Sequence, residues 1–271
     1  MQKLTYPTKT MGLTQNYNMG SHYGASHGSP CSYPIDDGCS DTGRDYFYAP
    51  CDLVVKRIYG VGNKGANTIW LQSTNKVQLA NGKESIVTIL VTHPEDDDLS
   101  KIKVGQKFNQ FDKMFREGGD GGGNIRYGNH FHIEVSTCEY SKLSNSGWVK
   151  NNKNTWVMTP YPIKPEQAFY VDKKFTNIRK TQGLTFKELI EPTPTKQTLY
   201  LPSSATKWRV YKLNVVPKVG NECGYLYPSK FGGLKYEILR WTDYKDVCVI
   251  KTRDYGQVQI YVAKSTGAII K

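Results

Sequence analysis

The stretch Gly128-Asn129-His130-Phe131-His132-Ile133-Glu134-Val135 combines apolar alternation with two histidines. Side chains two residues apart on a β-strand point to the same face, so the alternation predicts that His130 and His132 project side by side. Neutral imidazole is the commonest protein metal ligand and a frequent general base. The stretch therefore predicts a strand that presents two imidazoles to one cavity, with two merely solvated histidines as the alternative.

Short runs of β-branched and aromatic residues, separated by Gly, Asn and Asp, continue through most of the chain. They occupy residues 53–58, 68–71 and 86–91 in the first half, and 199–201, 208–211, 236–239, 247–252 and 257–262 in the second. Strands separated by turns at this spacing predict an all-β protein. Short helices are expected only over 164–170, where Pro165 marks a helix start, and over 185–190.

A proline-spaced polar segment, Glu191-Pro-Thr-Pro-Thr-Lys196, interrupts the apolar pattern. It predicts a connector over 186–198 between an N-terminal domain over 1–185 and a small barrel of about five strands over 199–271. The net charge of +12 is uneven: residues 1–191 carry 23 Lys and Arg against 19 Asp and Glu, whereas residues 192–271 carry 13 against 5. The C-terminal region is therefore expected to attract polyanions.

Several classes of protein are excluded by what the sequence lacks. It has no helix-turn-helix pattern, zinc-finger spacing or arginine-rich arm, so no nucleic-acid partner is expected. No apolar run is long enough to cross a bilayer, and the first residues lack the apolar core of a secretion signal. The six cysteines have no Cys-x-x-Cys spacing and are expected to be reduced thiols, with Cys31 and Cys39 as a minor alternative for soft metal ligands.

All five histidines fall within the first 132 residues, at strand ends or in loops. A catalytic zinc site needs three protein ligands and a fourth position for water. His132 supplies one candidate ligand, and Asp36 supplies a carboxylate with Asp37 as its alternative. The N-terminal segment adds His22 or His27, and His93 follows the apolar run 86–91.

Two further motifs invite a functional interpretation. Asp96-Asp97-Asp98 lacks the spaced ligands and the glycine of a calcium loop, which favours a solvated acidic turn. Gly121-Gly122-Gly123 opens no helix, so a flexible cleft wall is favoured over a phosphate cradle.

The order of these residues resembles the lysostaphin-type zinc endopeptidases of peptidoglycan. The resemblance covers roughly residues 10–140 and is carried by Val104-Gly105-Gln106-Lys107, by Gly128 to Val135, and by Asp45 to Pro50 followed by Val54 to Ile58. The C-terminal region resembles a bacterial SH3-like wall-binding domain through Val249 to Thr252 and Tyr255 to Val262. The implied fold is an antiparallel β-sheet peptidase domain followed by a small SH3-like barrel.

The resemblance implies a role for each candidate residue. His22, Asp36 and His132 would bind Zn²⁺, with His27 as the alternative to His22, because the family spaces its first histidine and aspartate four apart and this chain does not. His93 and His130 would be catalytic, one acting on the attacking water and the other on the oxyanion.

The implied reaction is hydrolysis of an amide bond in peptidoglycan peptides, with anionic wall polymers as a second partner and a monomer assumed. Without an export signal, the chain resembles a bacteriophage endolysin, made in the host cytoplasm and acting on the wall after the membrane is permeabilised. The alternatives are a zinc amidase that cuts the sugar–peptide bond and a non-catalytic wall-binding protein on a peptidase scaffold.

Overall fold

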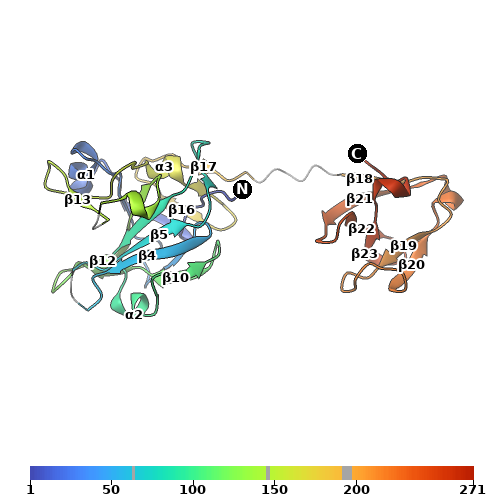
Figure 1. Ribbon diagram of the computed structural model, residues 1–271, viewed down its shortest axis with the longest axis horizontal. Helices are drawn as coiled ribbons and strands as arrows, with labels where there is room; N and C mark the ends of the chain where they lie inside the picture. The colour runs from blue at the N-terminus through green and yellow to red at the C-terminus, as the bar shows by residue number, and fades with distance from the viewer. Residues whose placement is uncertain (63–64, 145–146, 191–196) are drawn as a thin grey trace. The chain divides into compact units, whose positions relative to one another are not determined.

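The computed structural model describes residues 1–62, 65–144, 147–190 and 197–271, and these form two compact units, Met1–Ile190 and Glu191–Lys271 (Figure 1). The domain limits drawn from the sequence, 1–185 and 199–271, stay predictions. Residues 191–196 of the expected connector lie outside the described residues. No described helix has the length and apolar character needed to span a membrane.

The first unit is built mainly of strands. They are β1 (Thr10–Gln15), β2 (Ile35–Asp37), β3 (Tyr46–Tyr48), β4 (Leu53–Tyr59), β5 (Thr68–Ser73), β6 (Val77–Gln78), β7 (Glu84–Ser85), β8 (Thr88–Thr92), β9 (Lys107–Phe108), β10 (Lys113–Arg116), β11 (Gly118–Asp120), β12 (Arg126–Ser136), β13 (Val149–Lys150), β14 (Trp156–Val157), β15 (Tyr170–Val171), β16 (Asn177–Lys180) and β17 (Lys187–Glu188). The short helices are α1 (Tyr23–His27), α2 (Asp96–Leu99) and α3 (Pro165–Ala168), with 3-10 turns η1 (Gly20–His22) and η2 (Tyr140–Lys142).

One large sheet organises this unit, and its strands β12, β5 and β4 are labelled in Figure 1. The strand order is β16-β1-β2-β12-β8-β5-β4-β9, with β11 paired to β12. All of its pairings are antiparallel except that of β1 with β16. The central strand β8 is buried at every position, which explains its continuous run of β-branched and aliphatic residues. The outer strand β4 instead alternates, with Leu53 and Val55 buried and Val54 half-buried.

The two faces of this sheet have different surroundings. Phe131, Ile133 and Val135 of β12 pack into the main core, where the Phe131 ring meets Phe47 and Phe115 at centroid distances of 5.5 and 6.0 Å. Since successive strand residues alternate between faces, the even-numbered residues of β12 face the other way. That second face carries a smaller apolar cluster, Trp70, Leu90, Cys138, Leu143 and Met158, beside an open cleft.

The second unit is one antiparallel sheet with the order β20-β19-β23-β22-β21-β18-β24 and its own core. Its strands are β18 (Thr198–Leu201), β19 (Trp208–Tyr211), β20 (Glu222–Leu226), β21 (Leu234–Trp241), β22 (Val247–Thr252), β23 (Gly256–Tyr261) and β24 (Ile269–Ile270), with 3-10 turns η3 (Pro228–Phe231) and η4 (Lys264–Thr266). The all-β prediction is confirmed, and β20 and β24 are additional to the five strands expected.

The two helix predictions have different outcomes. Residues 164–170 contain α3, with Pro165 at its first position and Lys164 as the N-cap. The helix expected over 185–190 is wrong, because Lys187–Glu188 forms β17 and pairs in parallel with β15. All six cysteines are free thiols.

Replacing Phe131 with Ala should lower the free energy of unfolding of the first unit by about 3–5 kcal/mol, because a large aromatic side chain with no exposed surface leaves a cavity. Urea denaturation of a fragment covering residues 1–190 measures this change. The matched control is Val104→Ala, whose parent side chain is 64% exposed, and it should change stability by less than about 0.5 kcal/mol. A loss below about 1 kcal/mol for Phe131→Ala would contradict this account of the core.

Candidate metal centre and cleft

The register between β2 and β12 places a carboxylate beside a histidine. Asp36 lies directly opposite His132, and Asp37 lies opposite Phe131. Directly opposed residues of an antiparallel pair share a face, so Asp36 faces the cleft with His132. Asp37 faces the interior, where its carboxylate accepts hydrogen bonds from the Tyr6 and Thr8 hydroxyls. The alternative of Asp37 in place of Asp36 therefore has no support in the geometry.

His22 approaches the same carboxylate from the short turn η1. Its Nε2 lies 3.2 Å from Asp36 Oδ1, and His132 Nδ1 lies 3.2 Å from the same oxygen. One donor atom from each of His22, Asp36 and His132 lies within 4.8 Å of the other two. Two imidazole nitrogens and one carboxylate oxygen are a donor set that suits Zn²⁺. These three residues would hold a divalent cation through three ligand atoms.

A second carboxylate orients His132 from behind. Glu134 lies two residues along β12, and its Oε1 is 3.1 Å from His132 Nε2. Its Oε2 accepts a hydrogen bond of 2.9 Å from the Met158 backbone N–H. Histidine ligands of metals usually donate their outer N–H to such a group, which fixes the tautomer. Sequence reasoning missed this role, although the His-x-Glu spacing on a strand was its signal.

The electrostatics of the centre reflect two buried carboxylates around one ring. Burial would lower the pKa of His132, but hydrogen bonds to Asp36 and Glu134 raise it to about 10. Burial would raise the pKa of Asp36, but the contacts from His132 and His22 hold it well below its usual range. A cation is therefore favoured between these groups, and a metal ion would replace a proton on His132 Nδ1.

Two further histidines line the same cleft. The rings of His93 and His130 lie 4.5 Å apart between centroids, and His130 Nε2 is 3.9 Å from Asp36 Oδ1. Each ring is held by a backbone carbonyl, since His93 Nδ1 is 2.7 Å from the Asp120 oxygen and His130 Nδ1 is 2.7 Å from the Gly128 oxygen. A carbonyl only accepts, so each Nδ1 carries a proton and donates it to the backbone, and each Nε2 is the ring nitrogen left for the cleft. Burial, with the neighbouring histidines, lowers the pKa of His93 to about 3.

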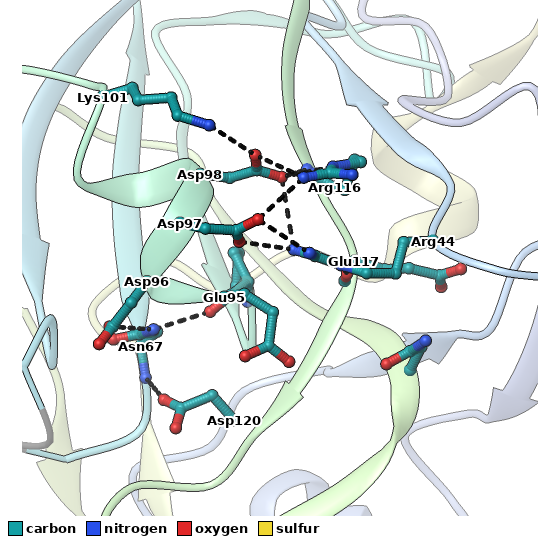
Figure 2. A network of polar contacts seen from close by, with 12 residues as sticks. Arg44, Asn67, Glu95, Asp96, Asp97, Asp98, Lys101, Arg116, Glu117 and Asp120 are labelled. Carbon is teal, nitrogen blue, oxygen red and sulfur yellow. Dashed lines mark hydrogen bonds and ion pairs between the residues drawn. The ribbon is translucent and has the colours of Figure 1, made fainter.

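The position of His93 depends on a network of backbone and side-chain contacts after β8. His93 has a left-handed backbone (φ 83°), which is uncommon for a residue other than glycine. Its N–H donates to the Asn67 carbonyl at 2.8 Å, and the Asn67 N–H donates to the Asp120 carboxylate at 2.7 Å. The Asn67 side chain also holds Asp96 at the start of α2 at 2.9 Å (Figure 2).

The acidic run 96–98 is part of this network and corrects a prediction. It forms the short helix α2 instead of a turn, whereas Asp96 and Asp97 are exposed as expected from the sequence. Asp97 and Asp98 form ion pairs with Arg44 and Arg116 (Figure 2). These arginines lie 53 and 19 residues away from Asp97, so the local composition did not reveal that the carboxylates are neutralised.

His27 is not brought to the centre. It ends α1 with an exposed side chain that stacks on Tyr23 at 3.9 Å between ring centroids. Of the two N-terminal histidines, the structure therefore places His22 beside Asp36. Cys31 is likewise apart from the metal candidates, with its thiol 3.8 Å from the Tyr33 hydroxyl.

The four histidines and two carboxylates described above lie in an open cleft of about 1040 Å³. Its walls include Tyr127, Trp148 and Trp156 as well as Leu90 and Thr92 of the sheet. Tyr127 and Trp156 are each 54% exposed, although both are large aromatic side chains. Aromatic side chains present a flat apolar surface to a ligand. The sequence analysis did not assign these residues, because Trp148 and Trp156 follow the motif-bearing region.

The chain is similar to known proteins in part of its sequence and in its fold. No family model matches the sequence. A stretch of 79 residues, 29% of this chain, is 42% identical to the endolysin of Listeria phage A511, and the match spans 23% of the length of that curated relative. Among solved structures, similarity extends to the antimicrobial peptidase lysostaphin from Staphylococcus simulans, with 14% identity and a TM-score of 0.34 over 96% of this chain and 95% of that one. An NMR solution structure of lysostaphin gives 13% identity and a TM-score of 0.28 over 84% of each chain.

The metal content of single variants should identify the ligands. Purified wild-type chain should bind zinc at this centre, and His132→Ala should lose it, because one of three protein ligands is gone. His22→Ala should lose the same ion, whereas His27→Ala should keep it. Elemental analysis after removal of loosely bound metal measures this. Full retention in His22→Ala together with loss in His27→Ala would reverse our assignment of the two histidines.

The contact behind His132 gives a second expectation. Glu134→Gln should weaken zinc affinity by about 10- to 100-fold while leaving the ion bound at high concentration, as expected when the outer partner of a ligand loses its charge. Competition with a chromophoric chelator measures the affinity. Glu139→Gln, a nearby carboxylate on an exposed turn, is the control and should bind zinc as the wild type does. Unchanged affinity in Glu134→Gln would show that this carboxylate does not tune the centre.

Proposed function

We propose that the first unit is a zinc-dependent hydrolase that cuts amide bonds in the peptides of peptidoglycan. The observation that carries the proposal is the convergence of His22, Asp36 and His132 in a cleft that also presents the imidazoles of His93 and His130. Donor set, spacing and the outer contact to Glu134 all suit Zn²⁺. When bound there, zinc supplies Lewis acidity toward water and toward the substrate carbonyl.

The chain's own residues would handle the protons. His93 is neutral and offers Nε2 to the cleft, because its Nδ1–H is donated to the Asp120 carbonyl. It can accept a proton from the attacking water and return it to the departing amine. His130 offers its Nε2 from the neighbouring strand and, once protonated, can donate a hydrogen bond to the oxyanion. The two roles require both rings to reach one scissile bond, and their separation of 4.5 Å between centroids allows this.

A peptide substrate suits the shape of the cleft. It is open, about 1040 Å³ in volume, and walled by aromatic side chains, which favours an extended chain over a small molecule. The match to a protein named endolysin supports peptidoglycan as the polymer that carries the peptide. We propose that the chain is itself a phage endolysin, made in the host cytoplasm and acting on the bacterial wall.

The second unit would hold the enzyme on the wall. The region over 192–271 carries 13 Lys and Arg against 5 Asp and Glu, a field that attracts anionic wall polymers. A hollow of about 260 Å³ in this unit is lined by Lys207, Arg209 and the aromatic residues Trp208, Tyr211 and Tyr261. Attachment to a polymeric substrate raises the local concentration of a weakly bound catalytic unit.

Loss of either free imidazole should separate catalysis from metal binding. His93→Ala and His130→Ala should keep zinc but lose about 100-fold or more of the hydrolytic rate, as expected for groups that act on water and oxyanion. Mass spectrometry of fragments released from purified walls measures the rate and identifies the bond. New amines within peptides would support an endopeptidase, whereas peptides freed whole from the glycan would show an amidase. No released fragments at all from the zinc-loaded wild type would favour the non-catalytic alternative.

The two units should also divide the work. A fragment over 191–271 should sediment with purified walls, and added salt should weaken this binding by screening. A fragment over 1–190 should cut soluble wall peptides at the wild-type rate but clear intact walls more slowly. Pelleting and turbidity assays measure the two effects. Equal lysis of intact cells by the 1–190 fragment and the full chain would contradict the proposed attachment. Wall binding of the 191–271 fragment that does not change with salt concentration would indicate recognition by the aromatic hollow instead of by the positive charge.

A further inference from the structure

A second group of metal-ligand side chains lies beside the cleft, on different elements from the first. Cys39 and Asp45 come from the segment between β2 and β3, and Glu117 joins β10 to β11. One donor atom from each lies within 4.8 Å of the other two. Glu117 also contributes to the wall of the cleft, as do Asp41 and Gly43 of the same β2–β3 segment.

Burial makes this group unusual. The side chains of Cys39 and Glu117 are 0% and 1% exposed. One oxygen of Glu117 accepts a hydrogen bond of 3.0 Å from the Asp45 backbone N–H, but Oε2 is buried and has no hydrogen-bond partner among the described residues. A buried carboxylate oxygen without a hydrogen-bond partner lowers the stability of the fold, because it loses its hydration and gains no bond in exchange. The Cys39 thiol, a weak donor, is the side chain that faces this carboxylate, and burial together with the charges of Asp37, Glu117 and Asp45 raises the pKa of that thiol.

No described cation neutralises the group. Among the described residues, no Lys or Arg nitrogen forms an ion pair with Asp45 or Glu117. Arg44 donates its Nε–H to the Glu117 carbonyl, but its terminal nitrogens reach Asp97 and Asp98. Burial, with the charges of Asp45 and Asp37, raises the pKa of Glu117 to about 7. Asp45 accepts hydrogen bonds from the Ser40 N–H and hydroxyl, so Glu117 and Cys39 are the members of the group on which a metal ion would replace protons.

We propose that Cys39, Asp45 and Glu117 form a second divalent-metal site, separate from the centre at His132. A thiolate with two carboxylates favours a thiophilic ion of the Zn²⁺ class over Mg²⁺ or Ca²⁺, which prefer oxygen ligands alone. Its role is structural: the ion would tie the segment that follows β2, the strand that carries Asp36, to the β10–β11 junction. Glu117 Oε2 would be one ligand of the ion. The ion would also replace the proton of the Cys39 thiol, and that proton passes to solvent.

Cobalt substitution of the full-length chain tests the proposal, because a thiolate bound to Co²⁺ gives a near-ultraviolet charge-transfer absorption that imidazole and carboxylate ligands do not. The metal-free protein is titrated with Co²⁺ alone under reducing conditions. Wild type and His132→Ala should both show the absorption, and Cys39→Ser should lose it. Cys31→Ser and Cys51→Ser are matched controls and should keep it. Glu117→Gln and Asp45→Asn should bind Co²⁺ at this site at least about tenfold more weakly.

The outcomes are independent of the centre at His132. Absence of the absorption from wild type, or its survival in Cys39→Ser, would overturn the proposal even if the first site binds metal normally. Where Cys39→Ser fails to fold by circular dichroism, Glu117→Gln decides, and an affinity equal to the wild type overturns the proposal. Absorption that persists in His132→Ala supports it whatever that variant does to hydrolysis.

Discussion

The antiparallel pairing of β2 with β12 is the constraint on which the candidate site depends. It sets Asp36 opposite His132 and, through the alternation of strand side chains, sends Phe131 and Asp37 to the other face. A slip of one residue would exchange these sets, burying the histidines in the core and exposing phenylalanine to the cleft. The main core and the cleft are therefore not independent features, because the apolar packing of Phe131 and Ile133 holds the register that aligns the polar groups.

The same register places two carboxylates, those of Asp36 and Glu134, in a buried environment. Asp36 and Glu134 are both nearly fully buried, and both contact the single ring of His132. Two buried carboxylates need a compensating cation, which a protonated imidazole supplies only in part. This imbalance explains why the geometry fits a divalent ion and why the outer carboxylate belongs to the centre.

Much of this arrangement was predictable from local patterns, and the rest was not for identifiable reasons. The alternation around His132 predicted both the strand and the shared face, and the turn spacing predicted the all-β class. The sequence left open which of Asp36 and Asp37 faces the cleft, because this is set by pairing with β12, almost a hundred residues later. The ion pairs of Asp97 and Asp98 depend on Arg44 and Arg116, which lie far away in the sequence, and the cleft-wall residues Trp148 and Trp156 come from a segment outside the motif region. The strand at Lys187–Glu188 forms because β15 offers it an edge, a tertiary effect that outweighs its helical pattern.

The way in which His93 and His130 are held has a consequence for how the chain tolerates mutation. The tautomer of a histidine is set by the hydrogen bond that its second ring nitrogen makes, and where the partner is a side-chain carboxylate a single substitution can reverse it. Here both Nδ1 protons are donated to main-chain carbonyls, at Asp120 and Gly128, and every amino acid supplies that acceptor. The course of the backbone therefore determines that Nδ1 is the protonated nitrogen that each ring donates to the main chain. A substitution at Gly128 leaves its carbonyl in place so long as the β11–β12 hairpin keeps its course, whereas the Asp120 carboxylate also accepts a hydrogen bond from the Asn67 N–H and so helps to hold the segment around His93.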